Sequence, residues 1–284
     1  MPIKIVTDST SDLPQAVAAE HGITVIPAYI NIGDKSYLDG VELSRQEFYE
    51  RLPDYDPPPT TSAPGLGTFV EAYERLAAEG AAEVLSIHIS STLSGMLNVA
   101  HSAAQTLKRV RVTVFDSRQL TLGTGFLALA AAKAAAVGRS MAEIVASLKE
   151  MVSRVYVFAA VDTLEFLRRS GRLTRLQSGL GALLSMKPLL TLYDGEITME
   201  RIRTRSHAIE RLISLATELG PLEEVALLHA HAPDRAEEFR YQIQHLIPQD
   251  IAPFSVEVTP VIGAHVGPGA VGLVCVKARE RLAV

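Results

Sequence analysis

The chain has 284 residues, 48% of them apolar and 21% charged, a balance that is ordinary for a globular protein and excludes an intrinsically disordered chain. Its formal net charge of −5 provides no basic surplus for a phosphate backbone, so no nucleic-acid partner is expected. The single cysteine, Cys275, excludes an intrachain disulfide framework and fits a reducing compartment.

Strand-like and helix-like segments alternate in the first half of the chain. Helical periodicity and capping patterns predict helices between these strands and after the last of them. The β–α alternation predicts a mostly parallel sheet covered by helices, with ligand-binding loops at the carboxyl ends of the strands. Short apolar runs predict the strands at 3–7, 24–32, 83–89 and 112–115. The predicted helices end before residue 22, begin at 44, and span 66–79, 94–107, the alanine-rich segment around 125–137, and 140–152.

The second half of the chain predicts a second unit of mixed strand direction. We expect an N-terminal α/β domain of residues 1–153 and a C-terminal α/β domain of residues 154–284. Asp194 and Gly195 signal a tight hairpin, so the second sheet is predicted to be mixed. Strands are predicted at 155–161, 189–193, 196–203, 225–228, 255–261 and 270–276. Helices are predicted directly after Asp162, at 174–184, between the strands that end at 203 and begin at 225, and at 234–246.

Two loops carry more hydroxyl groups than local structure requires. The loop SSTLSG at 90–95 lies between a strand and a helix, where unpaired N–H groups suit a carboxylate or a phosphate. Ser91 and Ser94 add hydroxyl groups there, whereas a plain helix cap needs one serine. Thr61 and Ser62 form a second hydroxyl pair, although hydroxyl groups before a proline also commonly cap the next helix.

A third segment, IGAHVGPGA at 262–270, predicts that His265 lies on a glycine-rich turn between two strands. A neutral imidazole donates one hydrogen bond, and a neighbouring anion raises its pKa. Together with the hydroxyl-rich loops, this histidine predicts a small-anion site; a purely structural histidine is the alternative. Arg172 and Arg203 lie on predicted loops or edges, where they can contact a phosphate if they border the site.

The sequence lacks the usual signatures of a cofactor or metal enzyme, and neither a cofactor nor a metal is expected. A dinucleotide-like string, GTGFLA at 123–128, does not directly follow a strand and lacks the acidic residue that should end a later strand. His229 and His231 could offer two metal ligands, but no cysteine or acidic cluster completes a tetrahedral set. A hydrolase of acyl esters or phosphoesters, with Ser94 as nucleophile and His265 as base, stays open.

No segment predicts export or stable membrane insertion. The first residues reach Asp8 before a signal-peptide core could form. The longest apolar stretch, 125–137, contains Lys133 and is too short to span a bilayer. We therefore expect a cytoplasmic protein.

Several sequence blocks together resemble the DegV family. They occur in the family's order across nearly the whole chain, so their joint match is far more specific than any single block. The resemblance implies a bacterial fatty-acid-binding protein of two α/β domains, with the acyl chain buried between or beneath them. The blocks are KIVTDSTSDLP at 4–14, TSAP at 61–64, ISSTLSG at 89–95, DS at 116–117, DTLEFL at 162–167, GRL at 171–173, KPLL at 187–190, DG at 194–195 and IGAHVGPGA at 262–270.

The same resemblance implies a role as the acyl carrier of a fatty acid kinase. A separate ATP-dependent kinase subunit would phosphorylate the bound carboxylate to an acyl phosphate for phospholipid synthesis, and this chain would not be catalytic alone. By position, the residues similar to the family's carboxylate-binding set are Thr61, Ser94, the N–H of Gly95 and His265, with Ser62 and Ser91 nearby. Arg172 and Arg203 resemble the basic residues that favour the phosphate and the partner. Ser170 stands where the family commonly has glycine, and Met96 where it commonly has threonine.

Overall fold

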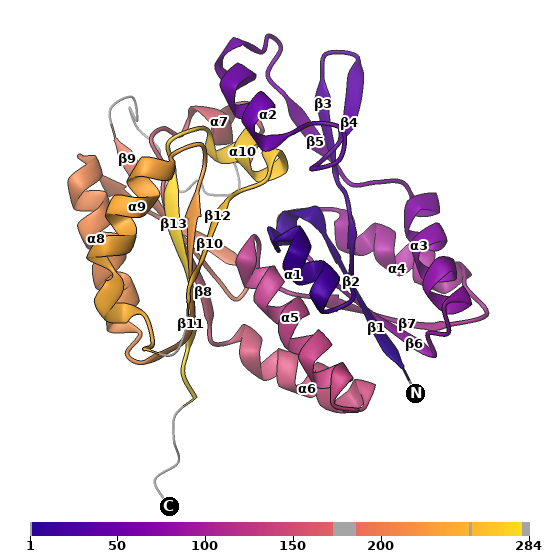
Figure 1. Cartoon of the computed structure of the whole chain (residues 1–284). Coiled ribbons are helices and arrows are strands. Elements are labelled where there is room, and N and C mark those ends of the chain that lie inside the picture. Colours follow the sequence, from indigo (N-terminus) through magenta and orange to yellow (C-terminus); the bar gives the residue numbers. More distant parts are fainter. Residues whose placement is uncertain (1, 173–185, 250–251, 280–284) are drawn as a thin grey trace, which may run out of the picture.

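Two β-sheets form the framework of the molecule, and they confirm the predicted α/β class (Figure 1). The computed structural model describes residues 2–172, 186–249 and 252–279. The first sheet has four parallel strands in the order β2-β1-β6-β7. These strands are β1 (Ile3–Asp8), β2 (Ile23–Ile26), β6 (Glu83–His88) and β7 (Arg111–Asp116).

Helices cover both faces of this sheet, as its β–α alternation predicts. The capping box predicted at Ser140 is confirmed, because its hydroxyl and its N–H both bond to Glu143. One face carries α3 (Leu66–Ala78) and α4 (Met96–Thr106), and the other carries α1 (Gln15–Glu20), α5 (Leu122–Ala136) and α6 (Met141–Val152) (Figure 1).

The second sheet is mixed and has six strands in the order β10-β9-β8-β13-β11-β12. Its pairs are antiparallel except for β11 and β12, which are parallel. The hairpin predicted at Asp194-Gly195 is confirmed as the β9–β10 turn. The strands are β8 (Val155–Ala160), β9 (Lys187–Tyr193), β10 (Glu196–Ile202), β11 (Leu222–His229), β12 (Phe254–Glu257) and β13 (Val271–Lys277).

Helices of the second unit lie mainly on the outer face of this sheet. There α8 (Arg205–Glu218) and α9 (Pro233–Gln242) cover the strands (Figure 1). On the inner face, α5 packs against β8 and β13 while its other side packs against β1. Most of α5 is therefore buried, and its alanines and glycines allow both sheets to approach closely. The predicted division of the chain near residue 153 stays a prediction.

The strand predicted at 24–32 is wrong, because Pro27 and Ala28 separate two strands that join different sheets. Proline has no N–H to donate to a ladder, so β2 ends before it. The chain then forms a small antiparallel sheet in the order β4-β3-β5, which stands with α2 above the first sheet (Figure 1). These elements are β3 (Tyr29–Ile32), β4 (Lys35–Leu38), α2 (Arg45–Arg51) and β5 (Thr60–Ser62).

The predicted turn around His265 is also wrong, because this residue lies on the short helix α10 (Pro260–Val266). The strand before it ends at Glu257 rather than at residue 261. Gly263 is required by packing, since a Cβ there would lie 2.6 Å from Cζ of Tyr49. The glycines at 263, 267 and 269 predict a turn, but Gly263 lies within α10, where the missing side chain allows the helix to contact Tyr49.

Two further expectations concern the start of the second unit. The helix predicted directly after Asp162 is confirmed as α7 (Glu165–Arg169), but Asp162 does not cap it: the hydroxyl of Thr163 accepts from the N–H of Glu165, at 3.1 Å. Asp162 instead forms ion pairs with Arg205, Arg235 and Lys187. The helix predicted at 174–184 lies outside the described residues. Among the described residues, short 3₁₀ turns lie at Ser9–Ser11, Leu52–Asp54 and Gln244–Leu246.

Candidate functional site

A cavity of about 620 Å³ lies between the first sheet and the inner face of the second. Its size falls within the usual range of small-molecule pockets, about 300–1,000 Å³. The β9–β10 hairpin contributes Leu190, Leu192 and Ile197 to the wall, and β8 contributes Val157 and Ala159. These side chains make a large part of the cavity apolar.

Polar groups border the same cavity where the loops follow β1 and β6. Ser94 and Gly95 lie at the start of α4, where the hydroxyl of Ser94 accepts from the N–H of Met96 at 3.2 Å. The N–H of Gly95 has no hydrogen-bond partner within the described part of the chain. Because helix N-termini carry partial positive charge, this edge of the cavity suits an anionic group.

Thr61 and His265 meet at the cavity from distant parts of the chain. The hydroxyl of Thr61 on β5 lies 3.0 Å from Nε2 of His265 on α10. Burial, and secondarily the charge of Arg172, lowers the pKa of His265 to about 3. The ring is therefore neutral near pH 7 and contributes a hydrogen bond rather than a charge.

The other nitrogen of this ring, Nδ1, is buried and has no partner among the residues that the structure describes. A neutral imidazole carries one N–H. If that hydrogen lies on Nε2 and is donated to Thr61, Nδ1 needs no acceptor and the hydroxyl hydrogen of Thr61 is available to a ligand. This tautomer avoids a buried donor without an acceptor.

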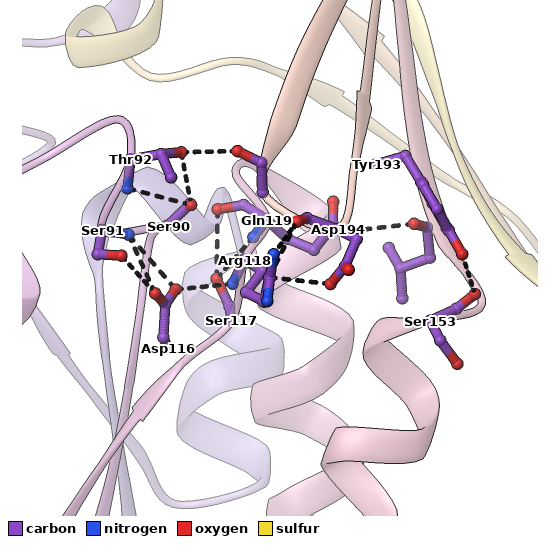
Figure 2. Close-up of polar contacts among 12 residues, drawn as sticks. Ser90, Ser91, Thr92, Asp116, Ser117, Arg118, Gln119, Ser153, Tyr193 and Asp194 are labelled. Carbon is purple, nitrogen blue, oxygen red and sulfur yellow. Dashed lines mark hydrogen bonds and ion pairs between the residues drawn. The ribbon is translucent and has the colours of Figure 1, made fainter.

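Of the other four predicted site residues, two border the cavity and two do not. Ser62 borders the cavity, but its hydroxyl lies 3.4 Å from Nδ2 of Asn31, on the face of β5 opposite to the Thr61 side chain. Ser91 is exposed, and its hydroxyl donates to Asp116 at 2.6 Å (Figure 2). Arg172 lines the cavity, whereas Arg203 is exposed and is not part of the lining.

Sequence reasoning missed Thr10, which also lines the cavity. The hydroxyl and the N–H of Thr10 both donate to Asp8, a fully buried carboxylate at the end of β1. Asp8 also accepts from the N–H of Ile89 at 3.2 Å and lies 2.9 Å from Nδ1 of His88. The carboxylate therefore joins the loops after β1 and β6. The acid–hydroxyl pattern directly after a buried strand was the available signal.

The tip of the β9–β10 hairpin is attached to the loops of the first sheet, which was also missed. Figure 2 shows the contacts: the hydroxyl of Thr92 donates to the carbonyl of Gly195 at 2.7 Å, and Arg118 bonds to the carbonyl and the carboxylate of Asp194, both at 2.9 Å. We call these four residues the hairpin latch. It holds the hairpin, and with it one wall of the cavity, against the first unit.

Neither a cluster of metal-ligating side chains nor a membrane-spanning helix is found in the described ranges. Within residues 2–172, 186–249 and 252–279, no group of three histidine, cysteine, aspartate or glutamate side chains is arranged to hold a metal ion. His231 instead lies 3.4 Å from Glu257 and stacks on Tyr49. Over the same residues, no helix has the length and apolar character needed to cross a membrane.

Comparison with known proteins agrees with this architecture. The model of a family described as uncharacterised protein, DegV family, matches residues 2–278. A DegV domain-containing protein of Streptomyces coelicolor is 38% identical over 276 residues, covering 96% of this chain and 97% of that protein. The crystal structure of DegV, a fatty acid binding protein from Bacillus subtilis, has a TM-score of 0.88 at 34% identity, covering 98% of this chain and 100% of that one. A DegV family protein from Thermus thermophilus, described by its fatty acid binding, has a TM-score of 0.89 at 34% identity with the same coverage. The chain therefore belongs to the DegV family.

Proposed function

We propose that the protein binds a long-chain fatty acid, with the acyl chain in the cavity and the carboxylate held by Thr61, Ser94, the N–H of Gly95 and His265. The observation that carries this proposal is an apolar cavity of about 620 Å³ bordered by hydroxyl groups, a helix N-terminus and a neutral imidazole. The relatives from Bacillus subtilis and Thermus thermophilus, described as fatty acid binding, support it.

The two parts of the cavity have different energetic roles. Removing about 15 methylene groups from water at ~0.8 kcal/mol each gives roughly 12 kcal/mol, an upper bound before the costs of binding. Burying a carboxylate is unfavourable unless its hydrogen bonds to water are replaced. The apolar wall therefore supplies affinity, while the hydroxyl and N–H donors offset desolvation and fix the orientation of the head group.

A carrier role follows from the position of these donors. Ser94 and Gly95 lie on the loop that follows β6, and Gly95 is exposed, which keeps the head group close to the surface. We propose that a separate ATP-dependent kinase subunit phosphorylates the bound carboxylate there, that Arg172 and Arg203 favour the phosphate or the partner, and that this chain is not catalytic by itself. The cytoplasm, where such a kinase has ATP, is the proposed location. Ser62 and Ser91 stay predictions, since their hydroxyls contact Asn31 and Asp116 instead.

The hydrolase alternative gains no specific support from the site. A serine hydrolase needs a histidine beside the nucleophile and a carboxylate that orients the histidine. Here Nε2 of His265 contacts Thr61, and Nδ1 meets no carboxylate among the described residues. The serine and histidine thus lack the relay that would activate Ser94.

The decisive experiment is mass spectrometry of lipids extracted from natively purified protein. We expect one fatty acid per chain, or uptake of one after incubation with a mixed pool. Ala159→Phe, which places a large side chain in the cavity wall, should fold but carry little lipid. Val137→Phe, on an exposed surface, is the matched control and should carry lipid like the wild type. Wild-type protein that takes up no fatty acid under either condition would contradict the proposal.

A further inference from the structure

Asp12 and Asp39 are two carboxyl groups buried below the start of α10. Asp12 is 1% exposed and Asp39 is 3% exposed. Asp12 accepts from the N–H of Thr259, immediately before α10, at 2.7 Å. Its other oxygen accepts from the hydroxyl of Thr121 at 2.7 Å. Asp12 thus connects the turn after β1 to α5 and α10, and α10 carries His265.

Asp39 has weaker connections than its neighbour. Neither of its oxygens has a hydrogen bond of ordinary geometry from a described residue, although the hydroxyls of Ser9 and Thr259 lie beside it. Thr259 lies between the two carboxyl groups, since its N–H donates to Asp12 and its hydroxyl lies beside Asp39, and the charge of Asp39 adds to the effects that raise the pKa of Asp12. Burying a carboxylate whose hydrogen bonds are not satisfied costs free energy, and a second negative charge beside it raises that cost for both groups.

Few charges are available to compensate this pair. Arg45 of α2 lies 3.6 Å from Asp12 and is partly exposed. The other charged groups that act here are Asp8, whose charge raises the pKa of Asp39, and Glu257, which together with Asp12 and Asp39 raises the pKa of Tyr49 on α2. One guanidinium therefore faces two buried carboxyl groups. Retaining one proton on the pair removes the imbalance, and burial accordingly raises the pKa of Asp12 to about 7 and that of Asp39 to about 6.

We propose that Asp12 is a positioning residue for the head-group site, holding α10 and thereby His265 against Thr61, and that it does so while sharing one proton with Asp39. This inference rests on the proposed fatty acid binding and adds its regulation by pH. Gly263 packs α10 directly against Tyr49, so a displacement of the helix start moves His265 with it. When both carboxyls lose their protons, repulsion between them loosens this attachment, and fatty acid affinity falls as pH rises through neutrality.

The test compares palmitate affinity across pH for three proteins. The wild type should bind about fivefold more weakly near pH 8 than near pH 6, the lower end of usual coupling between two sites. Asp39→Asn, which leaves one titrating carboxyl, should change less than about twofold over the same interval. Asp34→Asn, exposed in the β3–β4 turn, is the matched control and should follow the wild type. The carboxyl of palmitate titrates equally in all three proteins, so the comparison isolates Asp39.

Each outcome separates the two proposals. Equal pH profiles for the wild type and Asp39→Asn overturn the shared proton and the pH regulation but leave fatty acid binding intact, whereas no binding by any protein at any pH contradicts the proposed function instead. If Asp39→Asn does not fold, Asp12→Asn keeps an oxygen for the N–H of Thr259 and should show the same flat profile. Should neither variant fold, infrared spectroscopy of the ligand-free wild type decides: a C=O stretch from a protonated, buried carboxyl group must be present near pH 6 and lost toward pH 8. Absence of this band near pH 6 overturns the inference.

Discussion

The hydroxyl of Thr61 and Nε2 of His265 lie 3.0 Å apart although 204 residues separate them in the chain. One group comes from the small sheet of the first unit and the other from a helix of the second. The contact therefore exists only when both units are in place, and it forms part of the border of the cavity.

Replacing Thr61 by valine keeps the shape of the side chain and removes the hydroxyl. Hydrogen bonds to charged groups contribute about 1.5–3 kcal/mol, so we expect fatty acid affinity to fall by roughly tenfold or more. The buried N–H at Nε2 of His265 also loses its acceptor, so we expect a loss of about 1–3 kcal/mol in stability. Titration calorimetry with palmitate measures this. Thr60→Val, on the opposite and exposed face of β5, is the control and should bind normally. Equal affinity of both variants would remove Thr61 from the site.

Replacing Gly263 by alanine tests the packing of α10. The new Cβ would overlap the Tyr49 side chain, whose hydroxyl donates to the carbonyl of Val258 at 3.0 Å. Overpacking of this kind costs about 1–3 kcal/mol, and we expect weaker fatty acid binding as well because His265 shifts. Urea unfolding and palmitate titration measure the two effects. Gly67→Ala in α3, where a Cβ meets nothing within 4 Å, should be neutral or slightly stabilising.

Removing the latch contact of Arg118 tests the attachment of the β9–β10 hairpin. Arg118 and Asp194 are 49% and 46% exposed, so their ion pair should contribute less than about 1 kcal/mol to global stability. Locally, Arg118→Ala should speed amide hydrogen exchange at the hairpin tip, because the tip loses two anchoring hydrogen bonds. Arg139→Ala, which removes an exposed ion pair on α6, is the control. Unchanged exchange rates at residues 190–197 would show that the Thr92 contact and the β9–β10 ladder hold the hairpin tip without Arg118.

Much of the fold was predictable because its signals are local. Alternating strands and helices gave the parallel sheet, and Asp194-Gly195 gave the hairpin. The errors arose where a distant residue decides the local structure: Gly263 reads as a turn residue until Tyr49 is placed against it. The contact between Arg118 and Asp194 likewise joins distant parts of the chain, and neither position carries a sequence signal for the other.

The candidate site was predictable in a similar, partial way. Thr61, Ser94, Gly95 and His265 do border one cavity, and the hydroxyl-rich loop at 90–95 follows a strand end as expected. The second predicted loop is wrong in part, because Thr61 and Ser62 belong to strand β5. The direction of each hydroxyl could not be read from the sequence. Ser91 pairs with Asp116 because both follow neighbouring parallel strands, and that pairing depends on the register of β6 and β7.

The neutral state of His265 predicts a specific dependence of stability on pH. Burial lowers its pKa in the folded protein to about 3, below its usual value of 6.5. As pH falls from about 6.5 toward 3, the unfolded chain gains a proton on this ring that the folded chain does not, so folding loses free energy over that interval. His265→Gln removes this loss, and its free energy of unfolding should rise relative to the wild type as pH falls.

Urea unfolding of ligand-free protein at several pH values measures the difference, in which the titration of Asp12 and Asp39 cancels. His101→Gln, exposed on α4, controls for the loss of a histidine. Parallel curves for the wild type and His265→Gln would mean that the ring takes up its proton equally well in the folded protein, and His265 would then act on the carboxylate as a charge.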